Sequence, residues 1–166
     1  TVFAVAPANI TVNATASDSD GSVVSVEFFA ESVSLGVDTA SPYSVTWTNV
    51  AAGPYTLTAR AVDNLGAAAT SSPVTVTVNA APQVGLTAPD NGATFLAPGN
   101  IALTASAADS DGTIVKVEFY EGQNKLGEDA AAPHNFSWSG VSVGSYFLRA
   151  VAIDNVGAAA TSSVVN

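Results

Sequence analysis

The chain has 166 residues, of which 48% are hydrophobic and only 11% are charged, and it contains neither cysteine nor methionine. Its acidic side chains outnumber the basic ones by 14 to 4, and the resulting net charge of −10 argues against nucleic acid as a partner. The absence of cysteine excludes disulfides, thiolate metal sites and thiol catalysis. No apolar run approaches the roughly 18 residues that span a bilayer, so the sequence predicts no membrane insertion.

Short strands with a period of two are predicted through the first half of the chain, at residues 9–16, 22–30, 33–38, 43–48, 55–62 and 68–78. In the second of these strands Val24, Val26 and Phe28 share one face, while Ser25 and Glu27 point the other way. Glycine, proline, asparagine and aspartate turns separate the strands, and no helical periodicity intervenes. The pattern is typical of a β-sandwich.

The second half of the chain repeats the first at an offset of 91 residues. The gapless alignment of 18–75 with 109–166 holds 30 identities in 58 positions. Equivalent strands are therefore expected 91 residues further on, in two tandem domains at residues 1–80 and 81–166. Each domain has a net charge of −5, from six acids and one base in the first and eight acids and three bases in the second.

Tyr55 and Tyr146 each follow a glycine turn and open the strand that ends in Asp-Asn. That position predicts a tyrosine corner, in which the hydroxyl bonds back to the preceding loop. Trp47 and Trp138 lie in the preceding strand and are expected to be core side chains.

Several short motifs occur in both halves: D-x-D-G, V-x-V-E-F-[FY], L-G-x-D, a proline followed by an aromatic residue or histidine and then x-x-x-W, G-x-Y-x-L-x-A, and D-N-x-G. Their combination resembles the bacterial Ig-like modules of secreted glycoside hydrolases, adhesins and other cell-surface proteins, over almost the whole chain. The resemblance implies an all-β fold of two tandem immunoglobulin-like β-sandwich domains of about seven strands each. It also implies a non-catalytic part of a secreted or surface-attached bacterial protein.

The repeated D-S-D-G turns suggest a cation site. In an immunoglobulin-type sandwich the turns after the second and sixth strands lie at the same end, so three acids converge there and repel one another. Calcium takes six to eight oxygen ligands and would relieve that repulsion, which predicts one ion per domain. The expected ligands are Asp18, Asp20, Asp63 and Asn64 in the first domain, and Asp109, Asp111, Asp154 and Asn155 in the second.

An alternative reading of these turns needs no ion. Asp18 and Asp63 would accept backbone N–H bonds in Asx turns, and Gly21 would adopt a positive φ.

Three other sets of residues are candidates. His134, the sole histidine, stands where the first copy has Tyr43, and it is expected at the surface or rim because no nucleophile or orienting partner can be assembled around it. Phe29 and Tyr120 should face outward and are the candidate ligand-binding residues, with a polysaccharide as the ligand. Cross-strand ion pairs are expected on the outward faces, between Glu27 and Glu118 on one strand and Arg60 and Arg149 on its neighbour.

The ends of the chain also carry an expectation. Relative to the repeat, the first strand of domain 1 and the last strand of domain 2 are truncated, and the lack of an initiating methionine suggests a piece of something longer. Incomplete edges invite a strand from another chain. The sequence favours a structural spacer or adhesion segment whose partners are neighbouring repeats. The alternatives are a carbohydrate-binding accessory module of a polysaccharide-degrading enzyme and a filament subunit assembled by strand complementation.

Overall fold

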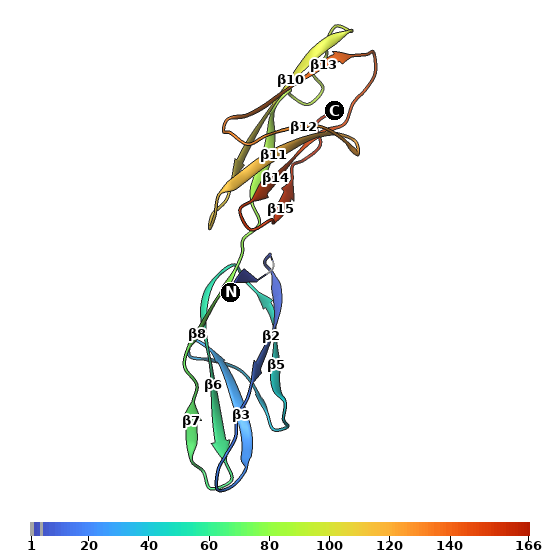
Figure 1. Cartoon of the computed structure of the whole chain (residues 1–166). Coiled ribbons are helices and arrows are strands. Elements are labelled where there is room, and N and C mark those ends of the chain that lie inside the picture. Colours follow the sequence, from blue (N-terminus) through green and yellow to red (C-terminus); the bar gives the residue numbers. More distant parts are fainter. Residues whose placement is uncertain (1, 4) are drawn as a thin grey trace. The chain divides into compact units, whose positions relative to one another are not determined.

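The computed structural model describes the backbone of residues 2–3 and the whole of residues 5–166, and this part of the chain consists of strands, turns and loops. The chain divides into two compact units, Thr1–Asn79 and Ala80–Asn166, here called unit 1 and unit 2 (Figure 1). Among the described residues no helix is long and apolar enough to cross a bilayer. The predicted all-β fold of two immunoglobulin-like sandwiches is confirmed.

Unit 1 packs a larger sheet against a two-stranded one. Its larger sheet has the order β1-β8-β6-β3-β4, with β7 also on β6, and β2 pairs with β5. The short β1 runs parallel to β8, and the other pairs are antiparallel. The strands are β1 (Val2–Phe3), β2 (Ala8–Ala14), β3 (Val23–Ala30), β4 (Val33–Asp38), β5 (Tyr43–Val50), β6 (Gly53–Asp63), β7 (Ala68–Thr70) and β8 (Val74–Val78).

Unit 2 packs a four-stranded sheet of order β12-β11-β14-β15 against a three-stranded sheet of order β13-β10-β9. The strands are β9 (Gln83–Ala88), β10 (Gly99–Ala108), β11 (Ile114–Glu121), β12 (Asn124–Asp129), β13 (His134–Val141), β14 (Leu148–Asp154) and β15 (Ala159–Thr161). Strands β10 to β15 match β2 to β7 at the predicted offset. The first strand, β9, has no counterpart among the described residues of unit 1.

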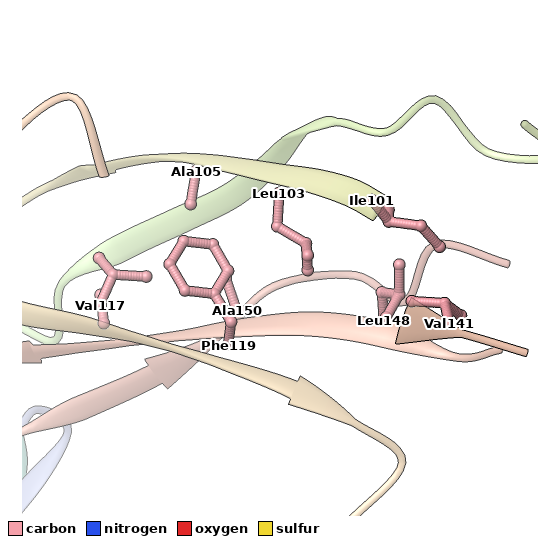
Figure 2. Close-up of a cluster of buried hydrophobic side chains, with 9 residues drawn as sticks. Ile101, Leu103, Ala105, Val117, Phe119, Val141, Leu148 and Ala150 are labelled. Atoms are coloured by element: carbon pink, nitrogen blue, oxygen red, sulfur yellow. The ribbon is translucent and has the colours of Figure 1, made fainter. Parts of the chain in front are cut away.

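The core of each unit follows from the alternation of apolar side chains. Phe28 of β3 and Phe119 of β11 are both 0% exposed, as their inward phase predicts. Figure 2 shows Leu103 and Ala105 of β10 pointing toward Phe119 and Ala150 on the opposite sheet. Both sheets therefore contribute one face to a shared hydrophobic layer.

The predicted tyrosine corners are present in both units. The Tyr55 hydroxyl donates to the Ala51 carbonyl at 3.1 Å, and the Tyr146 hydroxyl donates to that of Ser142 at 3.0 Å. Each tyrosine ring meets its tryptophan edge to face, with ring centroids 4.8 Å apart for Trp47 and Tyr55. The tryptophans are thus partly buried against the core, as expected.

One predicted strand, at residues 68–78, is divided in two. Strands β7 and β8 both pair with β6, and Ser71 lies between them. The Ser71 hydroxyl accepts a hydrogen bond from the Ala59 N–H at 3.0 Å, and the Ser71 N–H donates to the Ala59 carbonyl at 2.8 Å. The following Pro73 has no N–H to donate, so the regular ladder is interrupted there.

Candidate functional site

The two repeated turns that the sequence singled out do meet at one end of each unit. The Asn64 N–H donates to the Ser22 carbonyl at 3.0 Å, and the Ser22 N–H donates to Asn64 Oδ1 at 2.8 Å. In unit 2 the Asn155 N–H donates to the Thr113 carbonyl at 2.9 Å, and the Thr113 N–H donates to Asn155 Oδ1 at 2.8 Å. The asparagine side chain therefore imitates one more rung of strand pairing between the two turns.

The aspartate that precedes this asparagine organises its own turn. Asp63 Oδ1 accepts hydrogen bonds from the N–H groups of Leu65 and Ala67, both at 2.8 Å. The equivalent Asp154 is 2% exposed, and its Oδ1 accepts from Val156 at 2.9 Å and from Ala158 at 2.8 Å. The Asx-turn alternative is confirmed for this position.

The expectation of a positive φ at Gly21 is wrong, because the left-handed glycine of this region is Gly66, with φ 89°. Glycine is required at position 21 for space instead. A Cβ there would lie 2.8 Å from Asp18 Oδ2 and closer still to Asn64 Oδ1. Gly112 of unit 2 faces its own aspartate and asparagine in the same way.

One oxygen at each tip is buried and has no hydrogen-bond partner: Asp18 Oδ2 in unit 1 and Asp109 Oδ2 in unit 2. Burial raises the pKa of the Asp109 carboxyl above its ordinary value of 3.8, and the charges of Asp111 and Asp154 raise it further. A buried acceptor without a donor carries a desolvation cost, so this oxygen is the chemically distinctive atom of the tip.

The other expected calcium ligands have protein partners or face solvent. The oxygens Asp63 Oδ1 and Asn64 Oδ1 accept backbone hydrogen bonds, Asp111 Oδ2 accepts one from the Ala80 N–H at 3.0 Å, and Asp20 is exposed. Within the described part of the chain, no group of three or more His, Cys, Asp or Glu side chains is arranged to hold a metal ion. Among the expected ligands, the buried oxygens without a hydrogen-bond partner are Asp18 Oδ2 and Asp109 Oδ2.

A network of charges covers the outer face of unit 2. Lys116 and Lys125 each contact both Glu118 and Glu128, at N–O distances between 2.6 and 2.9 Å. These hydrogen bonds, with Lys125 the largest contributor, lower the pKa of Glu118 to about 2. All ion pairs between described residues belong to this network, so the expected pairs with arginine are wrong.

Tyr120, one of the two candidate ligand-binding residues, joins this network. Its hydroxyl donates to Glu118 Oε2 at 2.7 Å, and the guanidinium of Arg149 lies over its ring, 4.8 Å from the centroid. Phe29, its counterpart in unit 1, is half-buried on β3. Beside it the Ser34 hydroxyl donates to Glu27, whose register partner across the ladder is Arg60.

His134 lies in the core rather than at the surface or rim, because it occupies the position of the buried Tyr43. Its side chain is 3% exposed, and Nδ1 lies 3.1 Å from the Asp129 carbonyl oxygen. His134 is the first residue of β13 and occupies an inward-facing position, which buries it. The repeat indicates this orientation, because position 134 is equivalent to position 43.

Two structural aspartates, Asp38 and Asp129, are not among the predicted site residues, although the repeated L-G-x-D motif contains them. Asp38 Oδ1 accepts from the Ala40 N–H at 3.0 Å, and Asp38 Oδ2 accepts from the Ser44 N–H at 2.8 Å. Asp129 does the same for Ala131 and Asn135. These backbone bonds lower the pKa of both carboxyls. The signal for these two aspartates in the sequence is that they recur at the offset of 91 residues.

A model of the bacterial Ig domain family matches residues 2–59 and 82–150. The chain belongs to the bacterial Ig domain family. Domains of this kind are generally non-catalytic. A search of curated proteins gives no significant match.

Three solved structures illustrate what the chain is similar to. The fibronectin(III)-like modules of CbhA from Clostridium thermocellum share 31% identity with it, over 99% of this chain and 88% of that chain, with a TM-score of 0.49. SGBP-B of the Bacteroides ovatus mixed-linkage glucan utilization locus, in complex with a mixed-linkage heptasaccharide, shares 18% identity over 99% of this chain and 42% of that one, with a TM-score of 0.37. The D00-D0 domain of intimin shares 14% identity over 99% of this chain and 94% of that one, with a TM-score of 0.38.

The crowding around Gly112 gives a test of the tip. Replacing Gly112 with alanine should destabilise the protein by about 1–3 kcal/mol, because the new methyl group displaces Asp109 or Asn155. The control Gly85→Ala should be neutral or stabilising by up to about 1 kcal/mol, since a Cβ there meets nothing within 4 Å. Urea denaturation of both variants measures the difference, and equal stabilities would contradict the crowding argument.

The charge network gives a pH prediction. Because the folded-state pKa of Glu118 is about 2, below its ordinary 4.5, its contribution to stability is present above about pH 4.5 and is lost as pH falls through about 2. Glu118→Gln should therefore be less stable than the parent chain at pH 7, and the gap should close toward pH 2. Urea titrations at several pH values measure it, and a gap independent of pH would contradict this assignment.

Proposed function

We propose that the chain is a non-catalytic structural segment of a larger secreted or cell-surface bacterial protein, in which two sandwiches in series act as a spacer. The main support is that the repeated polar side chains at the tips are used to fix their own loops, in the same way in both units. Asn64 and Asn155 tie adjacent turns together, and Asp63 and Asp154 cap theirs. A position outside the cell rests on the resemblance to modules of secreted and surface proteins.

The chemistry of the two concave surfaces supports a role without catalysis. A groove of about 540 Å³ in unit 1 is lined by apolar, serine, threonine and asparagine side chains and by no acid, histidine, lysine or arginine. A groove of about 450 Å³ in unit 2 is lined by one carboxylate, Asp90, and by Tyr146, whose hydroxyl already donates to a backbone carbonyl. Neither groove assembles a nucleophile with a base, or an acid with a base.

The competing function, carbohydrate binding, would use Phe29 and Tyr120. Sugars stack on the faces of aromatic rings, and Arg149 already lies over the Tyr120 ring. The Tyr120 hydroxyl is also held by Glu118. These contacts favour a structural role for Tyr120 over a sugar platform.

Pull-down on insoluble cellulose, chitin and xylan separates the two functions. A spacer should stay in the supernatant with each polymer, and Tyr120→Ala should leave that distribution unchanged while lowering stability through the loss of its contacts with Glu118 and Arg149. Retention on one polymer that is abolished by Tyr120→Ala or Phe29→Ala would establish carbohydrate binding instead. A Val33→Ala variant on the exposed β4 strand serves as the control substitution.

We also propose that calcium binds at the tips, one ion per unit, with Asp18 and Asp109 as the principal ligands. The support is the buried carboxylate oxygen of each, which accepts no hydrogen bond, and in unit 2 the charges of Asp111 and Asp154 also act on Asp109. Calcium accepts six to eight oxygen ligands in a variable geometry and suits such a site better than magnesium, which demands a stricter octahedron.

Thermal unfolding in calcium, in magnesium and in chelator tests this proposal with Asp109→Asn. Calcium should raise the Tm of the parent chain, by mass action, and should raise that of the variant less. In chelator the variant should be the more stable protein, on the order of 1 kcal/mol, because it lacks a buried carboxylate without a donor. A Tm for the parent chain that is the same in excess calcium and in chelator would exclude the ion and leave the spacer function intact.

A further inference from the structure

The peptide group that joins Asn79 to Ala80 lies where unit 1 ends and unit 2 begins, and it is called the joint below. Its carbonyl oxygen, on Asn79, accepts a hydrogen bond from the Ala6 N–H at 2.9 Å, within unit 1. Its N–H, on Ala80, donates to Asp111 Oδ2 at 3.0 Å, within unit 2. One peptide group is therefore hydrogen-bonded to residues of both units.

No rotatable bond separates these two hydrogen bonds. The carbonyl of one residue and the N–H of the next belong to the same planar group, because the C–N bond between them has partial double-bond character. Two domains that are joined by a linker move through the φ and ψ angles of the residues between its fixed ends. Here the fixed ends are two atoms of a single planar group, so this source of movement is absent while both hydrogen bonds persist.

The chain on the unit 1 side of the joint is held by the core. Val78, the last residue of β8, pairs with Gly53 and is 0% exposed. Asn79 itself is 4% exposed. The segment that leads into the joint therefore belongs to the folded body of unit 1.

The chain on the unit 2 side is short and restricted. Only Ala81 and Pro82 lie between Ala80 and the first residue of β9, Gln83, which pairs with Ala108. Pro82 is buried, its ring holds its φ at about −65°, and it also restricts the conformation of the residue before it. Movement at the joint thus requires one of its two hydrogen bonds to open.

The two hydrogen bonds of the joint depend on different groups. The bond between Ala6 and Asn79 joins two backbone groups, and Ala6 packs against the core cluster that contains Val78. The bond from Ala80 depends on one exposed side chain, that of Asp111. Asp111 is therefore the residue at which the joint can be opened without a change to either core.

We propose that Asp111 keeps the joint stiff, by fixing the peptide group that unit 1 fixes from its other side. In this role Asp111 is a positioning residue for the chain between the units. Its use to the protein rests on the proposed spacer function, because sandwiches in series keep their reach only when the joint between them resists bending. The stiffness of the joint is measured separately from that function, which the polymer pull-down tests.

NMR relaxation of backbone amides in the whole chain tests the proposal. In the parent chain the amides of Ala80 and Ala81 should have order parameters of about 0.85, the value of a rigid backbone. In Asp111→Ala these order parameters should fall below about 0.6, and hydrogen exchange of the Ala80 amide should become roughly tenfold faster. The measurements are made in chelator, so that no ion bound at Asp109 replaces the lost hydrogen bond.

Two further variants serve as controls. Asp20 is the equivalent of Asp111 in the D-S-D-G turn of unit 1 and is also exposed, so Asp20→Ala should leave the amides of Ala80 and Ala81 unchanged. Asp111→Asn retains a side-chain oxygen that can accept from the Ala80 N–H and should keep most of the order. Unchanged exchange at residues 105–107, which pair with β9, shows in each variant that unit 2 remains folded.

Three results would overturn the proposal. Order parameters below about 0.6 at Ala80 and Ala81 in the parent chain would show a flexible joint with Asp111 in place. Unchanged order in Asp111→Ala would show a stiff joint that does not need this side chain. An equal loss of order in Asp20→Ala would assign the effect to a general disturbance of the tips. Each of these results leaves the spacer function to its own test.

Discussion

The burial of one phenylalanine per unit, opposite a glycine on the neighbouring strand, is the contact on which the rest of each sandwich depends. Phe119 pairs with Gly127 across the ladder between β11 and β12. The Phe136 ring stacks on the Phe119 ring, with the two ring centroids 6.0 Å apart. A Cβ on Gly127 would overlap that ring. In unit 1, Phe28 pairs with Gly36 in the same register. The glycine of L-G-x-D thus makes room for the core, and its aspartate fixes the next turn.

The same registers determine what gathers at the tip. Val23 pairs with Asp63 and Ile114 with Asp154, so the end of one strand and the start of its neighbour bring the two acidic turns together. The acids therefore meet because the strands that precede them are aligned by their apolar faces. Asp63 Oδ1 and Asp154 Oδ1 then each accept two backbone hydrogen bonds, which orders the loops. The buried oxygen at each tip that has no donor, Asp18 Oδ2 or Asp109 Oδ2, is what gives the tip its distinctive chemistry.

Much of this fold was predictable, because a period of two and a gapless repeat constrain both strand positions and the inward residues. The burial of Phe28 and the corners at Tyr55 and Tyr146 follow from those patterns. The features that the sequence did not predict depend on which partners individual side chains contact in the folded chain. The break at Ser71 arises from a hydroxyl that replaces a rung of the ladder, and the partners of Glu118 are lysines on adjacent positions of a curved sheet. His134 is buried because its position faces inward, although histidine as a residue type favours a surface or rim position.

The two units also serve as an internal comparison, since they share many residues and six strands but differ in their edge strands. Ala59 and Ala150 lie in equivalent strands with equivalent neighbours across the ladder, Phe28 and Phe119, yet only Ala150 is fully buried. Sequence identity at a core position therefore does not guarantee burial, because an inward side chain at the edge of a sandwich needs cover from the opposite sheet. In a two-layer fold this cover comes from the edge strands, which are held by few neighbours. In this chain the burial of equivalent core residues accordingly depends on which edge strands are in place as well as on the central residues.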